Sequence, residues 1–217
     1  KHFATRLIAD ARVALEEISA GLAHYQAPAA WADLAKSRKA EWRKAADAAT
    51  AASNSPLPSD AQVIGAVMRA YGNTASVVCA AGGLPGELHK LWNATAPGSY
   101  HLEYGYSCMG YEIAGGLGVK MAQPDRDVVV MVGDGSYLMM NSEIATAVMM
   151  GVKLNIVVLD NRGFGCINRL QMATGGDNFN NLLKDSHHVT LPAIDFAAHA
   201  ASLGAHAVKV SSLSEFE

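Results

Sequence analysis

The chain has 217 residues, of which 50% are hydrophobic and 17% are charged, and its formal net charge is -3. This composition can bury a sizeable core, which excludes an intrinsically disordered chain. The negative balance argues against nucleic acid as a partner, and no apolar run approaches the roughly 18 residues of a membrane span. Three scattered cysteines, Cys79, Cys108 and Cys166, exclude a disulfide framework and a zinc ribbon. They indicate a reducing, cytoplasmic compartment, and we expect each to be a small core residue.

Helical periodicity dominates the first quarter of the chain. Apolar residues recur at helical spacing from about residue 3 to 22, and a second helical stretch covers about 31–52. Acidic and basic side chains alternate in the second stretch, which favours a solvated face over one that binds nucleic acid. Turn-forming residues at 53–60 indicate a linker. Residues 1–55 look too short and too helical to bury a core alone, so they are the tail of something larger or arms packed on the main domain.

Strands and helices alternate after the linker. Two of the strands, 127–132 and 154–159, show almost no alternation of polar and apolar residues, which predicts burial on both faces. This alternation is typical of an α/β domain with a largely parallel sheet between helices. In chain order we expect a helix at 59–71, a strand at 76–80, helices at 86–94 and 110–122, the strand 127–132, a helix at 137–150, the strand 154–159, a helix at 191–203 and a strand at 207–210.

Polar residues follow the two strands that we expect to be buried. Gly133–Ser136 comes directly after the first strand, and Asn161 lies in the turn after the second. The separation of Asp134 and Asn161 is close to one βαβ unit. Because ligands of parallel sheets bind beyond the carboxyl ends of the strands, a carboxylate and an amide oxygen are expected to converge there.

The glycines at 133 and 135 would let the backbone approach a ligand, and the N–H groups of the following helix suit a phosphate. Asp134 alone would repel that phosphate, but a divalent cation between them removes the conflict. An ordinary turn with Asp134 as a helix cap is the alternative, which the matching turn at Asp160–Gly163 makes less favoured. A dinucleotide site is discounted because the third glycine of its motif is absent.

The Gly-Asp-Gly-Ser run and the later asparagine resemble the metal and diphosphate motif of thiamine-diphosphate-dependent enzymes. Residues 86–92 and 108–111 are similar to two further motifs of that family. Within it, the stretches 103–112, 133–144 and 159–171 most resemble the branch of hydrolases that opens a polyhydroxylated cyclic 1,2-dione in inositol catabolism.

The resemblance implies a thiamine-diphosphate-binding α/β fold with an N-terminal helical segment. Residues 56–217 would form a pyrophosphate- and magnesium-binding domain that ends before its natural C-terminus, and 1–55 the tail of a middle domain plus a linker. Magnesium would be held by the side chains of Asp134 and Asn161 and by the carbonyl of Gly163. Met109 would lie beneath the thiazolium ring. The other expected cofactor contacts are Gly83, Leu88, His89, Cys108, Gly110, Gly133, Gly135, Ser136 and Phe164.

The implied reaction is hydrolytic C–C cleavage of a small cyclic dione. The family activates its cofactor with a glutamate from a separate domain, so no catalytic residue is assigned here, and the chain is expected to be a fragment that is inactive alone. The full-length enzyme is expected to be a homo-oligomer without nucleic-acid or membrane partners. Arg169 or Gln171 could contact a hydroxyl-rich substrate. Two alternatives remain: an acetolactate-synthase-like carboligase or decarboxylase, and a non-enzymatic α/β binding module.

Overall fold

A computed structural model describes residues 3–53, 57–72 and 74–217. The chain divides into two compact units, Lys1–Ala45 and Ala46–Glu217. The division falls inside a helix rather than in the predicted linker, part of which lies outside the described residues. The domain boundary at residue 55 therefore stays a prediction. Within the described ranges, no helix is both long and apolar enough to cross a membrane.

The first unit contains α1 (Ala11–Gly21) and most of α2 (Ala29–Ala49). The carboxylate of Asp10 accepts the backbone N–H groups of Arg12 and Val13, so it caps α1 at its N-terminus. The helix predicted from residue 3 is therefore wrong over its first two turns, because a capping side chain ends the helical hydrogen bonding there. No residue of α1 is buried.

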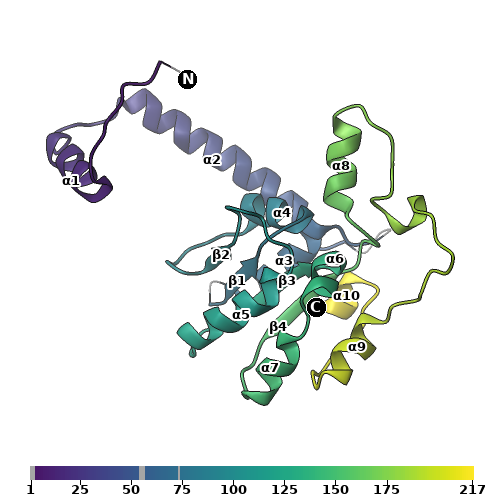
Figure 1. Cartoon of the computed structure of the whole chain (residues 1–217). Coiled ribbons are helices and arrows are strands. Elements are labelled where there is room, and N and C mark those ends of the chain that lie inside the picture. Colours follow the sequence, from purple (N-terminus) through teal and green to yellow (C-terminus); the bar gives the residue numbers. More distant parts are fainter. Residues whose placement is uncertain (1–2, 54–56, 73) are drawn as a thin grey trace. The chain divides into compact units, whose positions relative to one another are not determined.

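The second unit contains a four-stranded parallel sheet with the strand order β2-β1-β3-β4 (Figure 1). Its strands are β1 (Ser76–Cys79), β2 (Tyr100–Leu102), β3 (Val128–Gly133) and β4 (Asn155–Leu159). The predicted α/β fold class is thus confirmed. The predicted burial holds for β3 but is wrong for β4, which is half-buried at the edge of the sheet. An apolar run cannot show whether a strand has a neighbour on each side.

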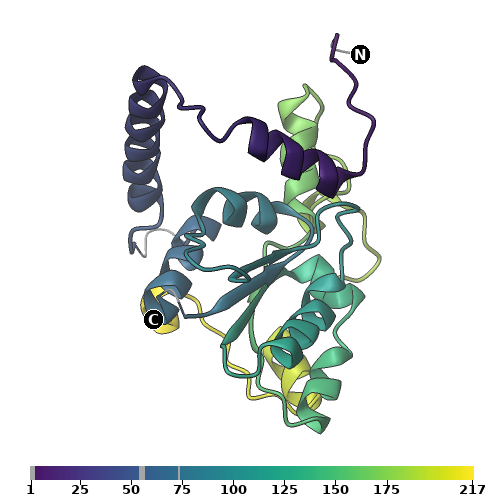
Figure 2. The same cartoon turned by 90° about the vertical axis from the view of Figure 1, so that its left-hand side faces the viewer.

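Helices cover both faces of this sheet (Figure 2). On one face, α3 (Asp60–Tyr71), α4 (Gly83–Leu91) and α10 (Leu213–Phe216) pack through a cluster that includes Ile64, Leu88 and Met131. On the other face, a second cluster includes Ile113, Val130 and Tyr137. It joins the sheet to α5 (Tyr111–Ala122), α6 (Asp134–Met139), α7 (Glu143–Met149) and α9 (Phe196–Ser202). A further helix, α8 (Gly165–Ala173), follows β4 and buries none of its residues.

Several predicted elements differ from the structure. The helix predicted over 137–150 is two helices, because the backbone of Met140 leaves the helical conformation between them. The first of these, α6, begins at Asp134, directly after the last residue of β3. The helix predicted over 86–94 begins at Gly83 instead. Strand β2 was not predicted because three residues are too few to show a period, and residues 207–210 form no strand because no neighbour pairs with them.

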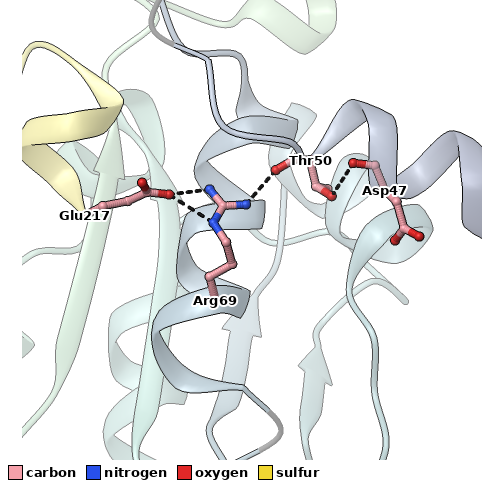
Figure 3. Close-up of polar contacts among 4 residues, drawn as sticks. All are labelled: Asp47, Thr50, Arg69 and Glu217. Carbon is pink, nitrogen blue, oxygen red and sulfur yellow. Dashed lines mark hydrogen bonds and ion pairs between the residues drawn. The ribbon is translucent and has the colours of Figure 1, made fainter.

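Arg69 joins three distant segments of the second unit (Figure 3). Its Nη1 donates to the carbonyl of Thr50 at 2.8 Å, and its guanidinium forms an ion pair with Glu217. A Cβ atom on Gly65 would lie 2.1 Å from that same Thr50 carbonyl oxygen. The absence of a side chain at Gly65 therefore lets the segment after α2 approach α3 closely enough for Arg69 to reach it.

Candidate functional site

The ends of β3 and β4 build the candidate site. Gly133 pairs with Leu159 across the two strands, so Asp134 and Asn161 emerge at the same edge of the sheet. Both line one cavity of about 170 Å³. The juxtaposition that the spacing predicted is therefore present. Nine of the residues predicted to bind the cofactor or the metal line this cavity: Gly83, Met109, Gly133, Asp134, Gly135, Ser136, Asn161, Gly163 and Phe164.

Four predicted residues do not line the cavity. Leu88 is fully buried in the core between α4 and the sheet. His89 is exposed, with its ring centroid 6.3 Å from that of Tyr100. Cys108 and Gly110 flank the cavity residue Met109 without lining the cavity themselves. The cofactor-binding roles of these four residues stay predictions.

Asp134 has the chemistry of a cation ligand. Its side chain is buried, and Oδ2 accepts the backbone N–H of Gly163 at 2.9 Å. The other carboxylate oxygen, Oδ1, has no hydrogen-bond partner among the described residues, and neither has the buried Oγ of Ser136. Burial and the neighbouring carboxylate of Asp160 raise the pKa of Asp134, although backbone N–H groups partly offset this. A buried acid with a free oxygen is stabilised by a bound cation.

The turn after β4 has a backbone that requires glycine. Gly163 has a φ of +142°, and a Cβ atom there would lie 2.5 Å from the carbonyl oxygen of Asn181. The next residue, Phe164, donates its N–H to that same carbonyl at 2.7 Å. The segment around Asn181 thus holds the turn against the cavity, where Gly163 also meets Asp134.

An apolar wall stands beside these polar groups. A Cβ atom on Gly135 would lie 2.8 Å from the ring of Phe164 and 3.4 Å from the terminal methyl group of Met109. These two side chains therefore converge on the backbone of Gly135. The cavity has a polar end at Asp134 and an apolar side, as a ligand with a charged part and a ring would require.

The donor set fits a hard cation that accepts mixed oxygen ligands. In the part of the chain that the structure describes, no three His, Cys, Asp or Glu side chains gather to bind a metal by themselves. Asp134, the amide oxygen of Asn161 and the carbonyl of Gly163 are oxygen donors of the kinds that magnesium accepts together with phosphate and water.

Two acidic residues at the site were missed. Asp60 was not predicted to belong to the site, yet it lines the cavity, where burial raises its pKa against the opposing charge of Arg169. No local pattern reveals this contact, because Asp60 lies far from the other lining residues in the sequence. Glu112 is 1% exposed and accepts backbone N–H groups from Ala81 and Gly110. The signal for Glu112 was its position as the one acid in a glycine- and alanine-rich helix.

Arg169 and the three cysteines also have defined places. A Cβ atom on Gly83 would lie 2.2 Å from Nη2 of Arg169, so the guanidinium rests against the backbone beside the cavity. Cys79 is a core residue as expected, and burial raises its pKa to about 11. The expectation of a buried core residue is wrong for Cys108, which is exposed in a loop. It is also wrong for Cys166, which is only half-buried and lines the cavity.

A parallel sheet between helices, with this polar edge beyond β3 and β4, is the architecture of α/β proteins whose ligands bind at the carboxyl ends of the strands. The chain belongs to the thiamine pyrophosphate enzyme family, because the family's C-terminal TPP binding domain matches residues 80–217. This confirms the resemblance found in the sequence.

Curated proteins that are named as hydrolases are similar to this chain. A 3D-(3,5/4)-trihydroxycyclohexane-1,2-dione hydrolase from Halalkalibacterium halodurans is 47% identical over 141 residues, which cover 65% of this chain and 22% of the relative. A protein of the same name from Bacillus thuringiensis is 45% identical over 161 residues, covering 71% of this chain and 25% of the relative. The chain thus matches about a quarter of the length of these relatives.

A solved structure shows the same fold. It is the thiamine diphosphate-dependent 4-hydroxybenzoylformate decarboxylase of Rhodococcus jostii RHA1, with a TM-score of 0.66 and 21% sequence identity. The match covers 76% of this chain and 30% of that one. The sheet and its flanking helices therefore have the thiamine-diphosphate-binding arrangement.

Proposed function

We propose that the cavity beyond β3 and β4 holds the diphosphate of thiamine diphosphate through a magnesium ion. Asp134, Asn161 and the carbonyl of Gly163 would be the protein ligands of the metal. The observation that carries this proposal is the buried carboxylate of Asp134, whose Oδ1 has no partner among the described residues and which lies beside Asn161 in the cavity. Membership of the family supports the choice of cofactor.

The remaining cavity residues have separate roles in this proposal. The backbone N–H groups of Gly135 and Ser136, with the unpartnered Ser136 hydroxyl, would donate to the phosphate oxygens. Met109 and Phe164 would provide the apolar contact for the thiazolium ring and exclude water from it. When bound, the cofactor would supply a nucleophilic carbon and an electron sink for C–C bond cleavage.

We further propose that this chain is part of an enzyme that hydrolyses a polyhydroxylated cyclic 1,2-dione in inositol catabolism. The names of relatives at 45–47% identity support this substrate class. Residues 56–217 would be the pyrophosphate- and magnesium-binding domain, and 1–55 the end of a middle domain with its linker. The full-length enzyme would be a homo-oligomer, and the scattered free cysteines fit a reducing cytoplasm.

The size of the cavity supports a site that is shared with other parts of a longer enzyme. Pockets that enclose an organic cofactor or a drug-sized ligand measure roughly 300–1,000 Å³, whereas this cavity measures about 170 Å³. It can surround a metal, a diphosphate and part of a ring. The activating glutamate and the rest of the ring pocket would come from sequence that the relatives have beyond the matched region, so the chain alone is expected to be inactive.

Calorimetry tests the cofactor site. Thiamine diphosphate is titrated into the chain with magnesium, then with excess chelator, and Asp134→Ala is run in parallel. We expect binding that needs magnesium and is lost in the variant. Equal binding with chelator, or full affinity in Asp134→Asn, would overturn the metal site and favour a non-enzymatic binding module. For the substrate, a panel of cyclic diones and 2-oxo acids given to the full-length enzyme separates the hydrolase from a carboligase.

A further inference from the structure

Two glutamates hold the backbone on both sides of Met109. The carboxylate of Glu103 accepts the N–H of Cys108 at 2.6 Å, immediately before Met109. The carboxylate of Glu112 accepts the N–H of Gly110 at 3.0 Å, immediately after it. A residue that lines the cavity is thus flanked by two peptide groups that each donate to a carboxylate.

Glu112 also reaches the opposite wall. Its Oε1 accepts the N–H of Ala81 at 3.3 Å, and Ala81 lines the cavity after β1. One side chain therefore connects the loop after β1 with the loop that carries Met109. No other described hydrogen bond from a side chain joins these two loops.

The burial of Glu112 indicates a specific role for its carboxylate. The side chain is 1% exposed, in the first turn of α5. Burying a carboxylate costs free energy unless hydrogen bonds to its oxygens compensate for the lost water. A glutamate that only filled space there could be replaced by an apolar residue at little cost, but only a carboxylate offers two acceptor oxygens to two loops at once.

The loop that Glu112 holds needs an external restraint. Gly110 has a φ of +92° and Ser107 has a φ of +55°, so the backbone on both sides of Met109 lies in the left-handed region. The segment from residue 104 to 108 is exposed to solvent. The two carboxylates therefore hold an otherwise exposed loop on both sides of Met109, whose side chain meets Gly135.

We propose that Glu112 is a positioning residue that sets Met109 against the ring-binding part of the cavity, with Glu103 as the outer restraint. This inference rests on the proposed function, because the purpose of the restraint is contact with a cofactor ring. Among the described residues, no hydrogen bond joins Glu112 to Asp134 or to the residues proposed to hold the diphosphate. The loss of Glu112 should therefore affect the two halves of the cofactor unequally.

The experiment compares two probes with magnesium present: thiamine diphosphate and inorganic diphosphate. In Glu112→Gln we expect thiamine diphosphate to bind about tenfold more weakly, while the dissociation constant of inorganic diphosphate stays within about twofold of that of the unsubstituted chain. Glu143→Gln is the matched control, since it makes the same change in the first turn of α7, outside the cavity lining, and should change neither constant. Equal weakening of both probes, or unchanged binding of thiamine diphosphate, overturns the proposal.

A measurement without ligand separates this inference from the proposed function. Glutamine has one acceptor oxygen on its amide, so it cannot satisfy both N–H groups through two oxygens. We expect hydrogen exchange at Ala81, at Gly110 or at both to become about tenfold faster in Glu112→Gln, with the sheet amides unchanged. Full protection at both amides overturns the restraint. An unsubstituted chain that binds neither probe overturns the cofactor site instead, whatever the exchange shows.

Discussion

Oδ2 of Asp134 accepts the backbone N–H of Gly163 at 2.9 Å, so the end of β3 is tied to the turn after β4. The same carboxylate leaves Oδ1 without a partner among the described residues. Asp134 therefore both links β3 to the turn after β4 and presents a free carboxylate oxygen to the cavity. The two roles can be separated by substitution.

Asp134→Asn should stabilise the chain in the absence of metal. Burial and the carboxylate of Asp160 raise the pKa of Asp134 in the folded state. Asp134 therefore begins to destabilise the fold when the pH rises above the pKa of an unfolded aspartate. The destabilisation grows until the pH passes the pKa of Asp134 in the folded state. The amide carries no charge and should raise the melting temperature at pH 7 by about 2–4 °C. Thermal melts with chelator from pH 4 to 8 check this. A lower melting temperature at every pH would contradict it.

Gly163→Ala should destabilise the chain by about 1–3 kcal/mol. A Cβ atom at this position meets the carbonyl of Asn181 in a backbone conformation that disfavours side chains. Gly151→Ala is the control, because Gly151 has a φ of +65° but its Cβ would meet no atom within 4 Å. It should cost only the conformational strain, about 1 kcal/mol. Urea unfolding of both variants gives the difference, and equal losses would show that the Asn181 contact relaxes.

The loop before Met109 should loosen in acid. Hydrogen bonds from the backbone of Cys108 and Tyr106 hold the pKa of Glu103 below its usual range. The restraint is therefore complete above the usual pKa of a glutamate and is lost as the pH falls through the lower folded value. Amide exchange at Cys108, corrected for intrinsic rates, should show protection falling along that course. Glu103→Gln should show a flat profile over the same range, and a pH-dependent profile there would assign the effect to another group.

The three cysteines should react at different rates with iodoacetamide. Cys79 is fully buried with a pKa near 11, so only about 0.1% of it is thiolate at pH 8. Desolvation and the carboxylate of Glu103 raise the pKa of Cys108, but Cys108 is exposed, so both it and the half-buried Cys166 should react faster than Cys79. Because Cys166 lines the cavity, magnesium with thiamine diphosphate should slow its reaction and leave that of Cys108 unchanged. Peptide mass spectrometry follows each site, and equal protection of both cysteines would point to aggregation rather than to a ligand.

The parts of the site that the sequence predicts are those set by strand order. Asp134 and Asn161 could be paired because each directly follows an apolar strand, and parallel strands end at the same edge. Asp60 and Glu112 could not be placed, because their positions depend on packing between segments far apart in the chain. The break at Met140 was missed for a related reason: the residues on either side continue the helical pattern, and Met140 packs close to Gly110.

The helix α6 begins at Asp134, directly after β3, and this limits where insertions and deletions can occur in the chain. No loop residue separates the last strand residue, Gly133, from the first helical one. Successive side chains of a strand point to opposite faces, so one inserted residue would turn the carboxylate away from the cavity and shift the whole helix. Insertions and deletions should therefore be excluded between residues 128 and 139, while the irregular segment 189–195, which lies beyond the contacts of Asn181 with the Gly163 turn, can change in length.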